Sequence, residues 1–187
     1  MKGTVITIGG PPGSGKSTAG RGLARLLNRE YVSAGAIFRE EARRRGIDLR
    51  ALGEIAQKDE RVDKTLDETM VGMASPHRIL EGRIIGELLV RRFIPVIRVY
   101  ITASEYTRAQ RIGRREGVPA DLVLPAMRVR EASEAARYRK YYGIELSDLH
   151  YEIGIDSTRQ DARQVVRTIH ERLPEDVRLA DAPVALT

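Results

Sequence analysis

Short apolar runs alternate along the chain with longer segments in which apolar residues recur every three or four positions. The short runs are rich in Val, Ile and Thr, and the first is apolar on both faces, which is typical of a strand buried in a parallel sheet. The pattern predicts five strands, at Thr4–Ile8, Tyr31–Ser33, Arg78–Glu81, Val96–Ile101 and Ile153–Ile155.

The longer segments predict helices. After the first strand, apolar residues recur at the i, i+4, i+7, i+8 spacing of one helix face, at Ala19, Leu23, Leu26 and Leu27. Further helical patterns cover 37–73, with breaks at Gly46 and near Asp59, then 104–115, 121–142 and the segment that carries Val165, Val166, Ile169 and Leu173. Gly143 suits the left-handed residue that ends a helix.

Local signals set further expectations in the second half of the chain. Pro125 is expected to lie in the first turn of its helix or to break the helix in two. The segment Thr158–Asp161 resembles a capping box at the start of the last helix. The tail 174–187 is expected to be frayed.

Strands that alternate with helices predict an α/β fold, a five-stranded parallel sheet with right-handed crossovers. The 187 residues suit a single domain over 1–187. Two helical regions, about 36–73 and about 113–146, have no strand of their own. They are expected to cover the carboxyl ends of the strands, where ligands bind in such sheets.

Composition excludes several classes of protein. There is no cysteine, so disulfide frameworks, cysteine-zinc sites and thiol nucleophiles are excluded. The three histidines are too far apart in the sequence for a histidine metal site. No apolar run approaches the ~20 residues that span a bilayer. The N-terminus leads directly into a strand pattern rather than a signal peptide. We therefore expect a cytoplasmic protein with no membrane partner.

The charge favours a partner that carries phosphate. The formal charge is +6, and 27 of the 32 basic residues are Arg, which binds phosphate bidentately. Codon bias or thermal adaptation explains such a bias equally well. With no Trp and two Phe, the chain has few aromatic platforms for nucleic-acid bases, so we expect no nucleic-acid partner.

A phosphate-binding loop follows the first strand. The spacing G-x-x-x-x-G-K-[ST] is typical of a P-loop, and a strand before it and a helix after it provide the required context. Its backbone N–H groups and the helix N-terminus bind phosphate oxygens, Lys16 reaches the β- and γ-phosphates, and Ser17 supplies a hydroxyl to Mg²⁺. The motif predicts a nucleoside triphosphate with Mg²⁺ and consists of Gly10, Pro11, Pro12, Gly13, Ser14, Gly15, Lys16 and Ser17.

Two further segments suit an acceptor molecule. Ser33 and Gly35 form a small-residue turn after the second strand, and Arg39 follows one helical turn later. At the end of the third strand, Gly82 allows close approach of a ligand and Arg83 can bind an anion, while Glu81 can orient water bound to Mg²⁺. The alternatives are a solvated helix face for Arg39 and an ion pair of Arg83 with Glu87 at i+4.

These motifs resemble the nucleoside monophosphate kinases, and in particular the archaeal-type cytidylate kinases, from about residue 4 to 172. The P-loop is generic, whereas the Arg-Tyr-x-x-x-Tyr-Gly stretch is more specific. The segments that carry the resemblance are 10–18 with Thr18, 33–39, 80–83, Arg115-Glu116-Gly117, Arg130-Glu131, Arg137-Tyr138 and Tyr141-Tyr142-Gly143-Ile144.

The resemblance implies that a phosphoryl group passes from ATP to CMP or dCMP with Mg²⁺ as cofactor. It also implies a core, a CMP-binding insertion at about 36–73 and a lid at about 113–146, in a protein that we expect to be a monomer. Arg39 and Arg83 would hold the CMP phosphate. Arg111 and Arg115 would contact ATP, and Arg130 and Arg137 would surround the transferred group.

The chain departs from the family pattern at Ala36, where an Asp is usual, at Pro125 within the lid helix, and in its longer tail. The residues also leave other readings open. Arg130, Glu134 and Arg137 share one helix face and could form a solvated salt-bridge row. Asp59, Asp63 and Asp67 could form a solvated acidic face, or Asp63 could accept a hydrogen bond from the cytosine amino group.

Three functions remain in view at this stage. The first is a cytidylate kinase. The second is an adenylate kinase or another small-molecule kinase, although Glu-Gly-Arg at 81–83 departs from the adenylate kinase pattern. The third is an RNA-associated P-loop protein, which rests only on the basic charge. No N-K-x-D guanine motif occurs, which argues against a GTPase.

Overall fold

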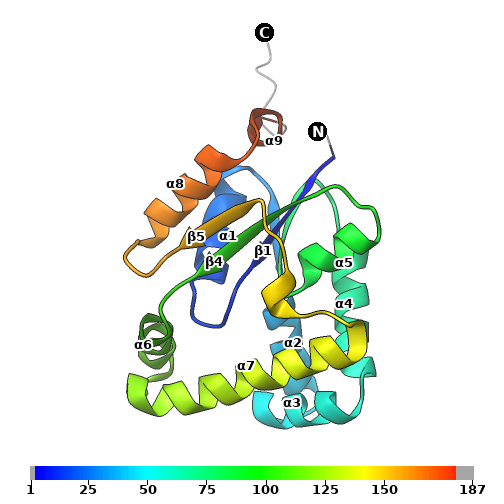
Figure 1. Ribbon diagram of the computed structural model, residues 1–187, viewed down its shortest axis with the longest axis vertical. Coiled ribbons are helices and arrows are strands. Elements are labelled where there is room, and N and C mark those ends of the chain that lie inside the picture. The colour runs from blue at the N-terminus through cyan, green and yellow to red at the C-terminus, as the bar shows by residue number, and fades with distance from the viewer. Residues whose placement is uncertain (1–2, 180–187) are drawn as a thin grey trace.

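The computed structural model describes residues 3–179 and contains one five-stranded, all-parallel sheet with the strand order β2-β3-β1-β4-β5 (Figure 1). The predicted α/β fold class is confirmed. The strands are β1 (Val5–Gly9), β2 (Glu30–Ser33), β3 (Arg78–Glu81), β4 (Val96–Thr102) and β5 (Ile153–Asp156).

Helices cover both faces of the sheet and its carboxyl end. They are α1 (Lys16–Leu26), α2 (Ala34–Arg44), α3 (Leu49–Lys58), α4 (Arg61–Gly72), α5 (Ile85–Arg91), α6 (Glu105–Glu116), α7 (Ala120–Tyr142), α8 (Ala162–Arg172) and α9 (Glu175–Leu179), with a short 3-10 turn at Leu146–Asp148.

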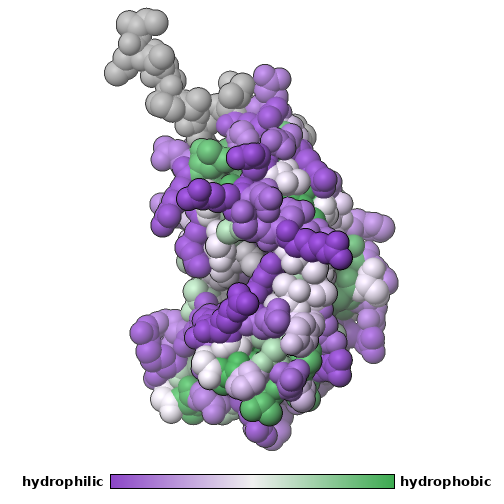
Figure 2. Space-filling model, turned by 90° about the vertical axis from the view of Figure 1, so that its left-hand side faces the viewer, coloured by the Kyte–Doolittle hydropathy of each residue, from purple (hydrophilic) through white to green (hydrophobic). Residues whose placement is uncertain are grey.

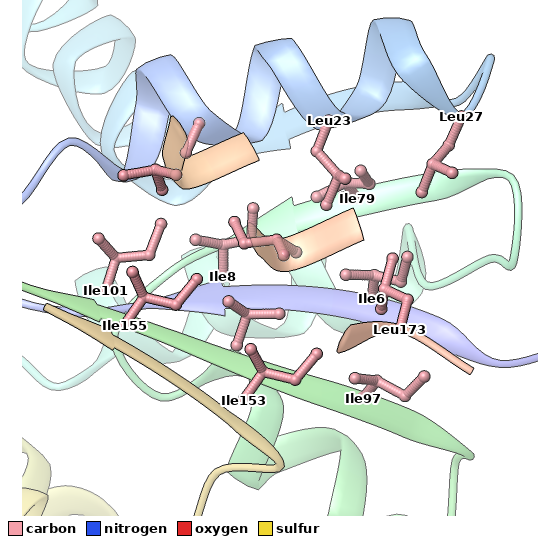
Figure 3. Close-up of a cluster of buried hydrophobic side chains, with 14 of the residues drawn as sticks. Ile6, Ile8, Leu23, Leu27, Ile79, Ile97, Ile101, Ile153, Ile155 and Leu173 are labelled. Carbon is pink, nitrogen blue, oxygen red and sulfur yellow. The ribbon is translucent and has the colours of Figure 1, made fainter. Parts of the chain in front are cut away.

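The central strand β1 is buried on both sides because it pairs with β3 and β4 and has helices above and below. On one face, Ile6 and Ile8 pack with Leu23 of α1 (Figure 3), in a cluster that also includes Ile169 of α8. On the other face, Leu80 packs with residues of α4 and α5. Burial of these side chains from water provides the main stabilisation of the sheet.

Two groups of helices lie beyond the carboxyl ends of the strands. Helices α2, α3 and α4 connect β2 to β3, and α6 and α7 connect β4 to β5, so both expected helical regions lie where the sequence places them (Figure 1). Across the gap between the groups, Gln57 Nε2 donates to Ser133 Oγ at 2.7 Å. The Tyr141 hydroxyl donates to the backbone carbonyl of Ala56 at 2.8 Å.

Side chains on the face shown in Figure 2 are mostly hydrophilic in its upper part, and hydrophobic ones gather at the lower end, where α6 and the start of α7 lie. Leu122 and Val129 of α7 are exposed, by 68% and 71%. Within residues 3–179, no helix combines the length and the apolar character needed to cross a membrane.

The expectation for Pro125 was wrong. Helix α7 runs unbroken through Pro125, its sixth residue. Proline cannot donate a hydrogen bond to the carbonyl four residues earlier, at Asp121. Asp121 is exposed and lies in the first turn of the helix, where water can take the place of the missing donor. The cost of the proline is therefore small enough for the helix to continue.

The ends of α8 also differ from expectation. Its capping box consists of Asp161 and Gln164, not Thr158 and Asp161. The Thr158 hydroxyl instead accepts from the backbone N–H of Ser104 at 2.8 Å. The start of the tail is not frayed, since α9 covers 175–179 and Val177 is buried in the core. Residues 180–187 lie outside the described part of the chain.

Leu23 and Leu26 of α1 provide a matched pair for testing this core. Leu23 is fully buried, whereas Leu26, which was expected on the core face, is 54% exposed. We expect Leu23→Ala to lower the free energy of unfolding by about 2–5 kcal/mol and Leu26→Ala to change it by less than about 0.5 kcal/mol. Urea unfolding of both variants measures the difference, and equal losses would contradict the assigned face of α1.

Candidate functional site

The phosphate loop lies between β1 and α1, at the carboxyl end of the central strand. Gly13 has a φ of +78°, and a Cβ atom on it would lie 2.6 Å from the backbone oxygen of Arg108, so no other residue fits there without displacement. Helix α1 begins at Lys16, which directs the free N–H groups of its first turn into the loop.

Lys16 is half-buried, and its Nζ donates to the backbone oxygen of Pro11 at 2.7 Å. Burial disfavours its charged form and lowers the pKa of Lys16 to about 8, although the nearby Glu81 carboxylate acts in the opposite direction. The loop thus holds an amine whose charge depends on pH near neutrality.

A buried carboxylate lies beside the loop at the end of β3. Glu81 is only 6% exposed, and its Oε2 accepts hydrogen bonds from Ser17 at 2.9 Å and from Ser33 at 3.0 Å. The same oxygen accepts from the Tyr31 hydroxyl. Burial and the Glu81 charge raise the pKa of Tyr31 to about 12, so this hydroxyl keeps its proton and donates.

One cavity of about 400 Å³ brings most of the predicted site residues together. It lies between the phosphate loop, the α2–α4 group and helix α7. The predicted residues that line it are Pro12, Gly13, Lys16, Ser17, Ser33, Gly35, Arg39, Asp63, Glu81, Gly82, Arg83, Arg115, Arg130 and Arg137.

A second cavity, of about 510 Å³, lies on the other side of the loop, towards α8. Gly13, Lys16 and Ser17 line both cavities, as do Ile112 and Arg115. The two cavities therefore meet at the phosphate loop. The remaining predicted loop residues that line the second cavity are Ser14, Gly15 and Thr18.

Glu134 of α7 joins two of the arginines in the first cavity. It is 8% exposed, and it accepts from Arg83 Nε at 3.0 Å and from Arg130 Nε at 2.8 Å. Burial raises the pKa of Glu134, but Arg83 and Arg130 outweigh burial and lower it overall. Arg83 does not pair with Glu87, which contacts Arg91 and Arg98 instead. The salt bridge between Arg130 and Glu134 expected of a charged α7 face is present, but Glu134 and Arg137 are buried, so the face is not a solvated row.

Arg137 faces the α2–α4 group. It is 7% exposed, and its Nε donates to Asp63 at 2.6 Å, while a second nitrogen donates to Ser133 at 2.9 Å. Burial raises the pKa of the Asp63 carboxyl, and Arg137 partly offsets this. Asp63 is thus a buried carboxylate in the wall of the cavity.

The other two carboxylates of the acidic series lie elsewhere. Asp59 pairs with Arg61 at the surface, at 2.8 Å. Asp67 accepts from the Tyr142 hydroxyl at 2.6 Å, and burial raises the pKa of Asp67 to about 6. Among these three, only Asp63 lines a cavity.

Arg111 is held by the loop itself. It donates to the backbone oxygen of Ser14 at 3.3 Å, and to the hydroxyl and backbone oxygens of Ser157 at 2.9 and 2.7 Å. Arg111 therefore lines the second cavity with most of its donors engaged. Arg115 is more open and pairs with Glu116 at 2.7 Å.

The N-terminus of α2 shows why alanine can occupy position 36. The N-cap of this helix is Ser33, whose hydroxyl accepts from the backbone N–H of Ala36 at 3.3 Å. The cap does not need a carboxylate at position 36.

Glu134, Tyr31 and Ser157 belong to the site but were not predicted from the sequence. Glu134 was noted only as a neighbour of two arginines on one helix. Its burial depends on the packing of α7 over the phosphate loop, which no local pattern records. Tyr31 lies in a predicted strand, and its contact with Glu81 follows from the pairing of β2 with β3.

Comparison with known proteins agrees with this arrangement. A family model described as an AAA domain matches residues 6–138. The chain is 38% identical to a cytidylate kinase from Methanothrix thermoacetophila over 161 residues, which cover 85% of this chain and 91% of that protein. It is 36% identical to a cytidylate kinase from Methanocaldococcus jannaschii over 168 residues, covering 88% and 94%.

A solved structure extends the likeness to the fold. A shikimate kinase from Bacteroides thetaiotaomicron superposes with a TM-score of 0.57 at 15% identity, over 90% of this chain and 97% of that one. The curated relatives match over nearly the full length, and the fold is shared with this shikimate kinase. The chain therefore belongs to the cytidylate kinase family of P-loop kinases.

Proposed function

We propose that the protein transfers the γ-phosphoryl group of ATP to CMP or dCMP and releases ADP and CDP or dCDP. One observation carries the proposal: two cavities, each large enough for a small ligand, meet at Lys16 and Ser17. A donor nucleotide in one and an acceptor nucleotide in the other would face each other across the phosphate loop.

The residues around this meeting point suit a phosphoryl transfer. The transition state spreads negative charge over the equatorial oxygens of the transferred group, so catalysis depends on positioned cations. Lys16 lies at the junction, and Arg130 and Arg137 approach from α7. We assign these three as catalytic residues and place Arg111 and Arg115 on the ATP side. The lid, 113–146, carries Arg115, Arg130 and Arg137.

The donor set beside the loop fits Mg²⁺. The Ser17 hydroxyl donates a hydrogen bond to Glu81, so the lone pairs of its oxygen can point to a cation. Mg²⁺ keeps several waters and takes few protein ligands, and one hydroxyl with one carboxylate nearby meets that requirement. When bound, Mg²⁺ would neutralise phosphate charge; Ser17 would ligate it and Glu81 would hold its water.

The acceptor phosphate is assigned to Arg39 and Arg83, with Ser33, Gly35 and Gly82 close by in the insertion and its flanks. Arg83 now donates to Glu134, so an arriving phosphate would take over a donor that a carboxylate holds. A phosphate monoester is already largely ionised near neutral pH, so its oxygen can attack without a general base.

Asp63 is the residue that we assign to the base. A carboxylate accepts a hydrogen bond from the exocyclic amine of cytosine and repels the carbonyl of uracil. Asp63 is 4% exposed and lines the same cavity as Arg39 and Arg83. Action as a monomer, in the cytoplasm and without nucleic acid, stays a prediction from the sequence.

The choice of acceptor tests the proposal directly. We expect the highest initial rate of ADP formation with CMP or dCMP, a lower rate with UMP and the lowest with AMP, at equal sub-saturating concentrations. A highest rate with AMP would favour an adenylate kinase, and no transfer to any nucleotide would contradict a nucleoside monophosphate kinase.

Asp63→Asn tests how the base is read. We expect the ratio of kcat/KM for CMP to that for UMP to fall by about tenfold, because the neutral amide oxygen is a weaker acceptor than a carboxylate and the amide NH2 can donate to the uracil carbonyl. Asp67→Asn is the matched control, because Asp67 lies four residues along the same helix but outside the cavity. An unchanged ratio in Asp63→Asn would remove Asp63 from the base site.

The pKa of Lys16 predicts how ATP binding depends on pH. The free protein loses the Lys16 proton as pH rises through about 8, whereas bound phosphate favours the cation. The Kd for Mg-ATP is therefore expected to be constant below that pH and to rise above it, approaching about tenfold per pH unit.

Calorimetric titrations between about pH 7 and pH 9.5 measure this dependence, with Lys16→Met as the comparison. That variant should bind Mg-ATP more weakly at every pH, without the extra loss above pH 8, and should transfer no phosphoryl group. A wild-type affinity that stays constant to the highest pH would contradict the role of Lys16.

A further inference from the structure

Tyr31 contacts the group that the proposed function assigns to the metal side of the site. Its hydroxyl donates to Glu81 Oε2, the same oxygen that accepts from Ser17 at 2.9 Å and from Ser33 at 3.0 Å. Three hydroxyls, one from helix α1 and two from strand β2, whose last residue Ser33 is also the N-cap of α2, therefore converge on one carboxylate oxygen.

The ring of Tyr31 packs against helix α1. A Cβ atom on Gly20 of α1 would lie 2.5 Å from the Tyr31 Cε2 atom, so the ring occupies the space that the glycine leaves. The Arg21 guanidinium lies 5.7 Å from the ring centroid, within the range of a cation–π contact. The ring also packs against the hydrophobic core beneath the sheet. The hydroxyl is thus presented by a rigid side chain.

The three donors make the two oxygens of Glu81 different from each other. Within residues 3–179, Oε2 accepts all of the hydrogen bonds that the protein gives to this carboxylate, and Oε1 accepts none. An oxygen that carries three donors fixes the plane and the direction of the carboxylate. The other oxygen is then left for a ligand from outside the chain, such as a water on a cation.

We propose that Tyr31 is a positioning residue for the metal side of the phosphate site. It orients Glu81 so that Oε2 accepts the hydrogen bond from Ser17 and Oε1 can accept a hydrogen bond from metal-bound water. Tyr31 itself touches neither nucleotide nor metal. The inference rests on the proposed function for its metal and its ATP, but not on the identity of the acceptor.

The test compares ATP binding with and without the metal. We expect Tyr31→Phe to raise the Kd for ATP about tenfold in the presence of Mg²⁺ and to change it less than about twofold in EDTA, measured by calorimetry. The Mg²⁺ concentration that gives half-maximal activity should rise, and the KM for CMP should stay unchanged. Tyr106→Phe removes a hydroxyl from an exposed tyrosine of α6 and serves as the control.

A second variant keeps the hydroxyl but displaces it. Gly20→Ala places a methyl group against the Tyr31 ring, so it should produce the same metal-dependent loss in a protein that retains all its tyrosines. Thermal unfolding establishes which of the two variants is folded, and either one alone decides the question.

The outcomes separate this inference from the proposed function. Equal weakening of ATP binding with and without Mg²⁺ would show a structural role for Tyr31 and overturn the inference, as would no change in either condition. If no nucleoside monophosphate proved to be an acceptor, the proposed function would fail while the metal-dependent loss of ATP affinity could still be observed.

Discussion

Mutual repulsion among cations is the constraint on which this site depends. Of the described residues, six with cationic side chains line the first cavity: Lys16, Arg39, Arg83, Arg115, Arg130 and Arg137. Such a cluster is stable in an empty protein only if nearby carboxylates offset its charge. Glu81, Glu134 and Asp63 do so, and each is less than 9% exposed.

These carboxylates also tie the parts of the fold together. Glu134 joins helix α7 to the end of β3 through Arg83, and Asp63 joins α4 to α7 through Arg137. Glu81 joins β3 to α1 and β2. A phosphate that enters the cavity must compete with a carboxylate for an arginine. We therefore expect the position of α7 to respond to the phosphates of both nucleotides, as in kinases whose lids exclude water before transfer.

Local sequence patterns were sufficient to predict many of the elements of this structure. The strand–loop–helix unit around Lys16 is recognisable because phosphate binding demands glycines and a helix start at fixed spacing. Strands β3, β4 and β5 were predicted to within one residue because each contains buried isoleucine, a residue that favours strands. The prediction failed at two positions where a local signal was misleading. Pro125 was expected to lie in the first turn or to break a helix that in fact continues. The capping box of α8 was placed three residues too early.

Contacts between distant segments could not be predicted in this way. Glu134 looked like one member of a charged helix face, and only the packing of α7 over the loop buries it between Arg83 and Arg130. The hydroxyl of Tyr31 reaches Glu81 because β2 and β3 pair in a particular register. Leu26 has the spacing of a core residue on its helix, but from this segment the core beneath the sheet includes Ala19, Leu23, Ala24 and Leu27 instead. Side-chain partners of this kind depend on the whole fold.

The central claim is that two nucleotide cavities meet at Lys16, and a linked compound that joins the 5′-phosphates of adenosine and cytidine tests it most directly. If the cavities meet, one molecule of such a bisubstrate occupies both, and its Kd should be at least about 100-fold lower than that of ATP, because the second binding event becomes intramolecular. Calorimetry should give one compound per chain and full competition with both ATP and CMP. A bisubstrate that binds no more tightly than ATP, or that leaves CMP binding unaffected, would contradict the account.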